Sequence, residues 1–305
     1  MGKIVAVTGA TGYVGRFVVP LLARQGIEVR VLARPTSNRD GFPAGIDWVL
    51  GDLLDPIVRQ TLVSRADVVV HLAYSHVPGR YRGGEGDDLS AWLSINLTGT
   101  LELMLEARNA SVAQFIFLSS RAVFSHTEKG RVLDESHPTS PDTHYGAYKA
   151  AIESMLRSFG AVEGMQTTAV RATGIYGLIW PVEQSKWWHL IQSVMADKVD
   201  LGNRGGTEVH GRDVARTILK LVQSPELAPD IVHLSDLYVT NRRIVEIARE
   251  IANRPGPLPP PSDTAMTNVL VCNRLSELGI ELGGEPLLRE TIRELVRATE
   301  SQQVH

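Results

Sequence analysis

The apolar residues of the first half of the chain fall into short, nearly continuous runs, separated by longer segments with helical spacing. Such runs are typical of strands buried on both faces of a parallel sheet, and apolar positions three or four residues apart indicate covering helices. Strands are expected at 4–7, 28–33, 47–50, 67–73, 114–118 and 166–171, and helices at 54–64, 92–107 and 143–159. This alternation predicts an α/β fold with a doubly wound parallel sheet.

The second half of the chain has a different pattern, with few strand-like runs. Helices are expected at 185–195, 212–223, 241–251 and 285–300, 230–234 could be a strand, and the proline-rich segment 255–261 indicates a stiff linker. We therefore expect two parts: a sheet domain over 1–173 and a smaller, mostly helical substrate-binding region over 174–305. The chain could cross back to the first part near 205–235. Ligands of open α/β sheets bind at the carboxyl ends of the strands, where this second region is expected.

Three regularly spaced glycines, Gly9, Gly12 and Gly15, follow the first predicted strand and precede a helical segment. A helix N-terminus offers backbone N–H groups to a nucleotide pyrophosphate, and glycine allows a close approach. A tight strand-to-helix turn without a ligand is the alternative. The position after the first strand favours a dinucleotide site in a Rossmann-like domain. The residues assigned to it are Gly9, Thr11, Gly12, Tyr13, Val14 and Gly15.

The end of the second predicted strand bears on the choice of nucleotide. An acidic residue there accepts hydrogen bonds from the ribose of NAD, whereas the 2′-phosphate of NADP requires a cation. This chain has Arg34, which favours NADP over NAD; stacking on the adenine or exposure to solvent are the alternatives. Asp52, after the third strand, could bind the adenine amino group or cap the following helix.

Composition narrows the class of protein. The 305 residues are 43% hydrophobic and 21% charged, with a net charge of −3, which gives no reason to expect a nucleic acid or an anionic membrane as partner. The single cysteine, Cys272, rules out an internal disulfide, and we expect it to be buried and inert. No signal peptide and no apolar run of about 18 residues is found, so we expect a cytoplasmic protein.

Tyr145 and Lys149 form a Y-x-x-x-K pair within a predicted helix. Side chains four residues apart share one helix face, so the ammonium would favour the phenolate and lower the pKa of the tyrosine from about 10 toward neutrality. Such a tyrosine can donate or accept a proton at a carbonyl or an alcohol. The pair follows the fifth predicted strand, which ends in Ser119 and Ser120.

Eight segments together resemble the extended short-chain dehydrogenase/reductases, the NAD-dependent epimerase/dehydratase group. They are TGATGYVG at 8–15, GDLLD at 51–55, VVHLA at 69–73, NLTGT at 96–100, FIFLSSRAVF at 115–124, YGAYK at 145–149, VRATGIYG at 170–177 and VHGRDVA at 209–215. The resemblance implies that Tyr145 is the acid/base and that Lys149 is its partner. It also implies that the hydroxyl of Ser120 holds the substrate oxygen, and Ser119 is the alternative for this role. It also implies a homodimer, and cofactor contacts at Leu53, Leu72, Ala73, Tyr74, Asn96, Ser119 and Ile175.

Departures from the pattern of this group narrow the expected reaction. The 4,6-dehydratases have an acidic pair where this chain has Arg121 and Ala122, so a dehydratase is not expected. Sugar-nucleotide enzymes often have an asparagine at Gly174 and an arginine at Gly206, although Arg204 could replace the arginine. These differences weaken the expectation of a nucleotide-sugar substrate.

Three functions fit these residues. The first is an oxidoreductase that acts on a secondary alcohol or ketone of a small substrate, which could be sugar-derived. The second is a nucleotide-sugar epimerase that retains NAD, and the third is a dinucleotide sensor without turnover. Arg34 favours the oxidoreductase, and the family resemblance favours the epimerase. The presence of Tyr145 and Lys149 argues against the sensor. No metal is expected, because His126, His144 and His210 lack companions at metal-ligand spacing.

Some segments leave alternatives open. The polar loop 74–88, which contains Arg80, Tyr81 and Arg82, is either a mobile flap or a plain surface loop. Trp187 and Trp188 either line a substrate pocket or pack between the two parts of the chain. His71 is expected to be a hydrogen-bonded core histidine.

Overall fold

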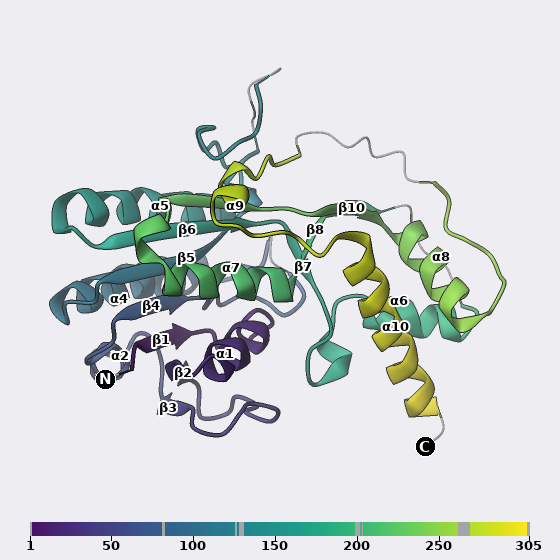
Figure 1. Cartoon of the computed structure of the whole chain (residues 1–305), viewed down its shortest axis with the longest axis horizontal. Helices are drawn as coiled ribbons and strands as arrows, with labels where there is room; N and C mark the ends of the chain where they lie inside the picture. The colour runs from purple at the N-terminus through teal and green to yellow at the C-terminus, as the bar shows by residue number, and fades with distance from the viewer. Residues whose placement is uncertain are drawn as a thin grey trace.

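The structure is a computed structural model that describes residues 2–80, 83–125, 127, 131–198, 202, 204–261 and 269–303. A parallel sheet lies between two layers of helices, and a smaller group of C-terminal helices packs beside it (Figure 1). Among the described residues, no helix combines the length and the apolar composition needed to cross a bilayer.

The main sheet has seven parallel strands in the order β3-β2-β1-β4-β5-β6-β9. Reversal of strand order on either side of β1 defines a doubly wound, Rossmann-like sheet, as expected. The six predicted strands are confirmed to within two residues at their ends, and the 230–234 run supplies the seventh. The strands are β1 (Ile4–Thr8), β2 (Glu28–Ala33), β3 (Asp47–Leu50), β4 (Val68–His71), β5 (Gln114–Ser120), β6 (Gln166–Ala172) and β9 (Ile231–Leu234).

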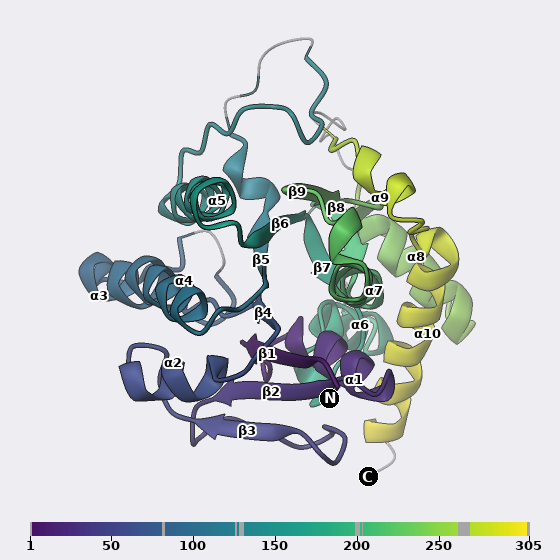
Figure 2. The same ribbon diagram turned by 60° about the vertical axis from the view of Figure 1, so that its left-hand side comes forward.

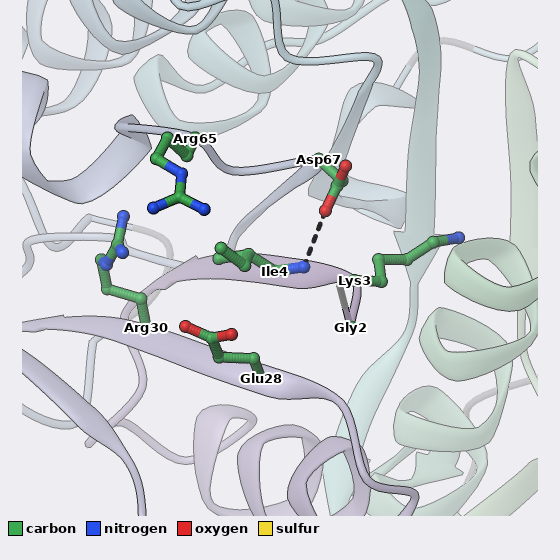
Figure 3. Close-up of a pocket in the computed structure, with 7 residues that line it drawn as sticks. All are labelled: Gly2, Lys3, Ile4, Glu28, Arg30, Arg65 and Asp67. Carbon is green, nitrogen blue, oxygen red and sulfur yellow. Dashed lines mark hydrogen bonds between the residues drawn. The ribbon is translucent and has the colours of Figure 1, made fainter.

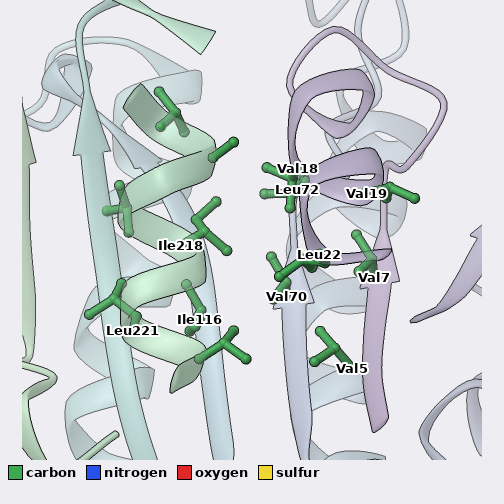
Figure 4. Packing of buried hydrophobic residues seen from close by; sticks show 14 of the residues in the cluster. Val5, Val7, Val18, Val19, Leu22, Val70, Leu72, Ile116, Ile218 and Leu221 are labelled. Carbon is green, nitrogen blue, oxygen red and sulfur yellow. The ribbon is translucent and has the colours of Figure 1, made fainter. Parts of the chain in front are cut away.

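Helices cover both faces of this sheet (Figure 2). One face packs on α1 (Gly15–Arg24), α7 (Gly211–Gln223) and α9 (Asn273–Glu277), in a buried cluster that includes Val18, Leu22, Val70 and Ile218 (Figure 4). The other face packs on α2 (Pro56–Val63), α4 (Gly99–Asn109) and α5 (His144–Glu163), in a second cluster. Burial of alternate strand residues in each cluster explains why the strands are apolar throughout.

The predicted helix 92–107 begins earlier and changes its winding part-way. It consists of α3 (Leu89–Leu93), a π-helical turn (Ser94–Thr98) and α4. The turn carries Asn96, and π-helical turns within α-helices are frequent at functional sites.

A second, three-stranded sheet of order β10-β8-β7 was not foreseen from the sequence. Its strands β7 (Gly174–Tyr176), β8 (Gly205–His210) and β10 (Leu237–Thr240) are short and rich in glycine, threonine and tyrosine, so they lack an apolar run. The predicted C-terminal helices are present as α6 (Trp188–Met195), α7, α8 (Asn241–Ala252) and α10 (Gly284–Gln303).

After residue 173 the chain forms part of the second sheet and then adds another strand and helix to the main sheet. β9 pairs with β6, and α7 packs against α1, although both elements come after residue 173. The predicted division of the chain at 173 therefore stays a prediction. The predicted crossing of the chain back to the first part, near 205–235, agrees with the place of β9 in the strand order.

Candidate active site

The carboxyl ends of β1, β4, β5 and β6 bring most of the predicted site residues to one edge of the sheet. Thr8 at the end of β1 pairs with His71 on β4, and Ser120 at the end of β5 pairs with Ala172 on β6. The glycine turn follows β1, and the segment 72–74 follows β4. The edge is therefore the place at which a doubly wound sheet binds a ligand.

The glycines of the turn have two different roles. A Cβ on Gly9, which has φ +68°, would lie 2.6 Å from the backbone nitrogen of Ala73, and one on Gly15 would lie 2.2 Å from the oxygen of Ala10. These two positions exclude any side chain, because real Cβ atoms do not approach so closely. Gly12 is different, since it is exposed and a Cβ there would meet only the Gly9 oxygen, at 3.2 Å.

The start of α1 also suits an anion. Its first turn contains no acidic residue, and no side chain caps it. The positive end of the helix dipole favours a phosphate at this place, and Gly12 leaves room for its approach. The turn therefore fits the pyrophosphate of a dinucleotide.

Tyr13, assigned to the cofactor through the glycine motif, has a further structural role. Its hydroxyl donates to the carbonyl of Gly177 at 2.7 Å and accepts from the backbone nitrogen of Lys186 at 3.0 Å. The side chain therefore ties the glycine turn to the segment that follows β7. A contact of Tyr13 with the cofactor through its backbone stays a prediction.

Arg34 and Asp52 are neighbours at the carboxyl ends of β2 and β3. The Arg34 Nε lies 3.9 Å from the Asp52 Oδ2, and the two side chains are 60% and 51% exposed. Such an exposed pair is weak. The interpretation of Asp52 as a helix cap is wrong: Asp55 is the N-cap of α2, and its carboxylate accepts from the Ile57 nitrogen at 2.8 Å.

Asn96 braces the segment that follows β4. Its side-chain amide nitrogen donates to the carbonyls of Ser75 and Trp92, each at 3.0 Å, and its oxygen accepts from the Ser75 nitrogen at 2.8 Å. These bonds account for the structural part of the role that the resemblance implied. The contact of Asn96 with a cofactor stays a prediction. The same holds for the other contacts that the resemblance implied, at Leu53, Leu72, Ala73, Tyr74, Ser119 and Ile175.

His71 is a hydrogen-bonded core histidine, as expected. Its ring nitrogens bond to the hydroxyls of Thr8, at 2.6 Å, and Thr100, at 2.9 Å. Complete burial, together with the nearby Lys149 ammonium, lowers the pKa of His71 to about 3. The ring is therefore neutral and fixes Thr8, whose hydroxyl also accepts from the Ala73 nitrogen at 3.3 Å.

Tyr145 and Lys149 lie one turn apart near the start of α5. The Lys149 Nζ donates to the carbonyl of Leu118 on β5 at 2.7 Å and lies 5.8 Å from the centre of the Tyr145 ring. The Tyr145 ring is in turn 4.8 Å from that of Tyr74, which follows β4. The structure therefore brings the predicted tyrosine, its lysine and the wall after β4 together.

No pattern in the sequence indicates which groups set the pKa of Lys149. Its burial lowers the pKa to about 7, and the Glu153 carboxylate acts in the opposite direction. Glu153 is paired with Arg171 at 2.8 Å, and their side chains are 1% and 2% exposed. The charge state of Lys149 therefore depends first on its burial and then on a carboxylate one turn further along α5.

The two serines at the end of β5 differ in their partners. Ser119 is buried, and its hydroxyl donates to Glu153. Ser120 is half-buried and caps the short helix Arg121–Val123 by accepting from the Ala122 nitrogen at 3.1 Å. Because Ser120 is the acceptor in that bond, its hydroxyl hydrogen can still be donated to a substrate oxygen. This favours Ser120 over Ser119 as the substrate-binding hydroxyl.

Gly146 is a residue of the site that sequence reasoning missed. A Cβ there would lie 2.2 Å from the carbonyl oxygen of Ala122, so only glycine lets α5 pack this closely on the turn after β5. Thr143 starts the helix at this point by accepting from the Gly146 nitrogen at 3.0 Å. The signal was present, because Gly146 directly follows Tyr145.

Among the other conspicuous residues, Trp188 packs in the core, whereas Trp187 is half-buried and both of its alternatives stay open. Trp188 is buried in the C-terminal core, and Trp187 stacks on Tyr176 with ring centres 4.9 Å apart. Cys272 is half-buried rather than buried, and burial raises the pKa of its thiol to about 11. No group of three metal-ligating side chains occurs among the residues that the structure describes. Tyr81, Arg82 and His126 lie outside those residues.

A hollow at the opposite end of the sheet contains none of the predicted site residues (Figure 3). Its lining includes Lys3, Glu28 and Arg30 near the amino ends of β1 and β2, and Arg65 and Asp67, which precede β4. The Asp67 carboxylate accepts from the Ile4 nitrogen at 2.7 Å. The amino ends of parallel strands are not where ligands of such sheets bind.

Comparison with known proteins identifies the family. The model of the NAD dependent epimerase/dehydratase family matches residues 5–234. The chain belongs to this family. It is therefore an NAD(P)-dependent enzyme of the extended short-chain dehydrogenase/reductase type, as the motifs indicated.

Family members of known structure or activity resemble the chain over most of its length. A UDP-glucose 4-epimerase of Streptomyces lividans is 31% identical over 243 residues, which are 76% of this chain and 68% of the relative. The structure of the Thermotoga maritima UDP-glucose 4-epimerase with UDP-glucose has a TM-score of 0.80 at 19% identity, covering 99% of this chain and 100% of that one. The Thermus thermophilus enzyme in complex with NAD has a TM-score of 0.77 at 23% identity, covering 98% and 99%. At these identities the structures establish the fold alone.

Proposed function

We propose that the protein is an NADP-dependent oxidoreductase that acts at a secondary alcohol or ketone of a small substrate, with Tyr145 as the acid/base. The position of Lys149 carries the proposal. Its buried amine is bound to Leu118, one helical turn from Tyr145, at the same sheet edge as the glycine turn.

The residues around this edge have separate tasks in the proposed reaction. The dinucleotide, held at the glycine turn and the segment 72–74, supplies or accepts the hydride when bound. Tyr145 protonates the substrate oxygen as negative charge builds on it, and the protonated Lys149 reduces the cost of the phenolate. Ser120 donates a hydrogen bond to the same oxygen and fixes its position. In the reverse direction, Tyr145 removes the proton of the alcohol.

Arg34 supports NADP rather than NAD. It directly follows β2 and is 60% exposed, and within the described part of the chain its one ion pair is a long contact with Asp52, at 3.9 Å. A 2′-phosphate would offer it a stronger partner, because charge-assisted bonds to phosphate are short and can be bidentate. NADP enzymes usually exchange their cofactor at each turnover, which suits a reductase.

A second candidate, a nucleotide-sugar epimerase with retained NAD, is favoured by the relatives. The family member from Streptomyces lividans is named a UDP-glucose 4-epimerase, and one similar structure contains NAD. Arg34 and the absence of a side chain at Gly174 count against it in this chain.

The substitution Tyr145→Phe tests the proposed acid. With NADPH and a panel of ketones, and with UDP-galactose for the epimerase, turnover should fall by ~10²–10⁴-fold while NADPH affinity changes little. Tyr148→Phe is the matched control: it loses only a buried hydroxyl bonded to Thr100 at 3.2 Å, so turnover should change little. Full activity of Tyr145→Phe on any accepted substrate would refute the assignment.

We further propose that the protein is a homodimer through α4 and α5. Leu105 on α4 and Met155 and Val162 on α5 are 39%, 37% and 75% exposed, and such apolar side chains are candidates for an interface. Sedimentation should give twice the mass of the 33.4 kDa chain; a monomer would contradict this. The cytoplasmic location stays a prediction.

A further inference from the structure

Lys186 and Glu208 form an ion pair that the proposed reaction does not use. The Lys186 Nζ lies 2.5 Å from the Glu208 Oε2, and the side chains are 32% and 10% exposed. Burial raises the pKa of Glu208, and the neighbouring ammonium lowers it in part. A carboxylate this far from water requires a partner, and Lys186 is the cation that supplies it.

The pair adjoins the candidate catalytic residues. Ser120 pairs with Ala172 across β5 and β6, and Gly174, two residues on, pairs with Glu208 across β7 and β8. A Cβ on Gly174 would lie 2.4 Å from the Glu208 Oε2, so the carboxylate occupies the space of the missing side chain. The charge therefore lies against the segment that follows β6, two residues after the partner of Ser120 in the sheet.

The pair is also held in a fixed position. The backbone nitrogen of Lys186 donates to the hydroxyl of Tyr13, which belongs to the glycine turn, at 3.0 Å. The Lys186 Nζ lies 5.7 Å from the centre of the Trp187 ring, and that ring stacks on Tyr176. The Glu208–Lys186 pair therefore lies beside the stacked rings of Trp187 and Tyr176.

We propose that the Glu208–Lys186 pair selects a substrate with uncharged hydroxyl groups at this position and disfavours a nucleotide diphosphate. This inference rests on the proposed function of the same site. The positive charge of Lys186 is already neutralised, so a diphosphate would face a buried carboxylate, and the repulsion between these like charges disfavours binding. A hydroxyl group can donate to the carboxylate and accept from the ammonium, and a sugar-like ring can pack on Trp187.

Calorimetry with UDP-glucose as the probe tests the selection. The protein is first titrated with NADP⁺, or with NAD⁺ if only that binds, and the loaded protein is then titrated with UDP-glucose. We expect affinity weaker than millimolar in the unmodified protein and at least about tenfold tighter in Glu208→Gln, because the substitution frees the charge of Lys186. Glu226→Gln, an equal charge change beyond the end of α7, should have no effect.

The possible outcomes separate the two proposals. Micromolar binding by the unmodified protein, or no gain in Glu208→Gln, would overturn the selection by Glu208 and Lys186. Failure of the unmodified protein to bind either dinucleotide would instead refute the proposed function. Equal dinucleotide affinity in Glu208→Gln and the unmodified protein shows that the variant is folded and that the change lies in the substrate site.

Discussion

The titration of Lys149 makes a quantitative prediction about stability. Burial lowers the pKa of this amine from 10.5 to about 7 in the folded protein, whereas in the unfolded chain it keeps its ordinary value. Between these two values the unfolded chain binds more protons than the folded one, so stability rises with pH across that window. Below pH 7 both states are charged, and the full cost of burying the ammonium is present. Lys149→Met removes the titrating group and retains an unbranched side chain of similar length.

The magnitude follows from the two pKa values. A difference of one pH unit corresponds to about 1.4 kcal/mol in the steepest part of the window. From pH 7 to pH 9, the unmodified protein should gain roughly 2 kcal/mol relative to Lys149→Met. Urea unfolding of both proteins at a series of pH values measures this difference directly. A difference that stays constant with pH would show that Lys149 titrates alike in the folded and unfolded states, and the reasoning about its burial would be refuted.

Three further predictions concern the nucleotide and the core. Gly12→Val should abolish dinucleotide binding in calorimetry without loss of circular dichroism, because a side chain there meets only the Gly9 oxygen; retained binding would contradict the pyrophosphate site. Arg34→Ala should remove ~1–3 kcal/mol of preference for NADPH over NADH, and equal affinities in the unmodified protein would exclude that role. Glu153→Gln should cost ~3–5 kcal/mol in urea unfolding, because Arg171 is left buried without its partner; a cost below about 1 kcal/mol would contradict it.

The sequence was most informative where one physical requirement determines the residues. Strands of the main sheet are buried on both faces, so β2 and β3 could be delimited to the residue from their apolar runs. The motif around Tyr145 and Lys149 was found because the chemistry needs both groups on one helix face.

Features that depend on contacts distant in sequence could not be predicted. The strands of the second sheet are only three to six residues long, and β8 begins with two glycines, so no pattern identified them. The pairing of Glu153 with Arg171 joins α5 to β6, and that of Lys186 with Glu208 joins a loop to β8. Such pairs depend on the tertiary fold, and local periodicity carries no information about them.

The nucleotide present in the purified protein is the most direct test of the proposed reaction. The protein is unfolded, the released nucleotide is identified by mass spectrometry, and a second, intact sample is titrated with NADPH. An oxidoreductase that exchanges its cofactor should release little nucleotide and take up one equivalent of NADPH per chain. Release of about one equivalent of NAD⁺ per chain, with no uptake of NADPH, would contradict it and identify the epimerase alternative.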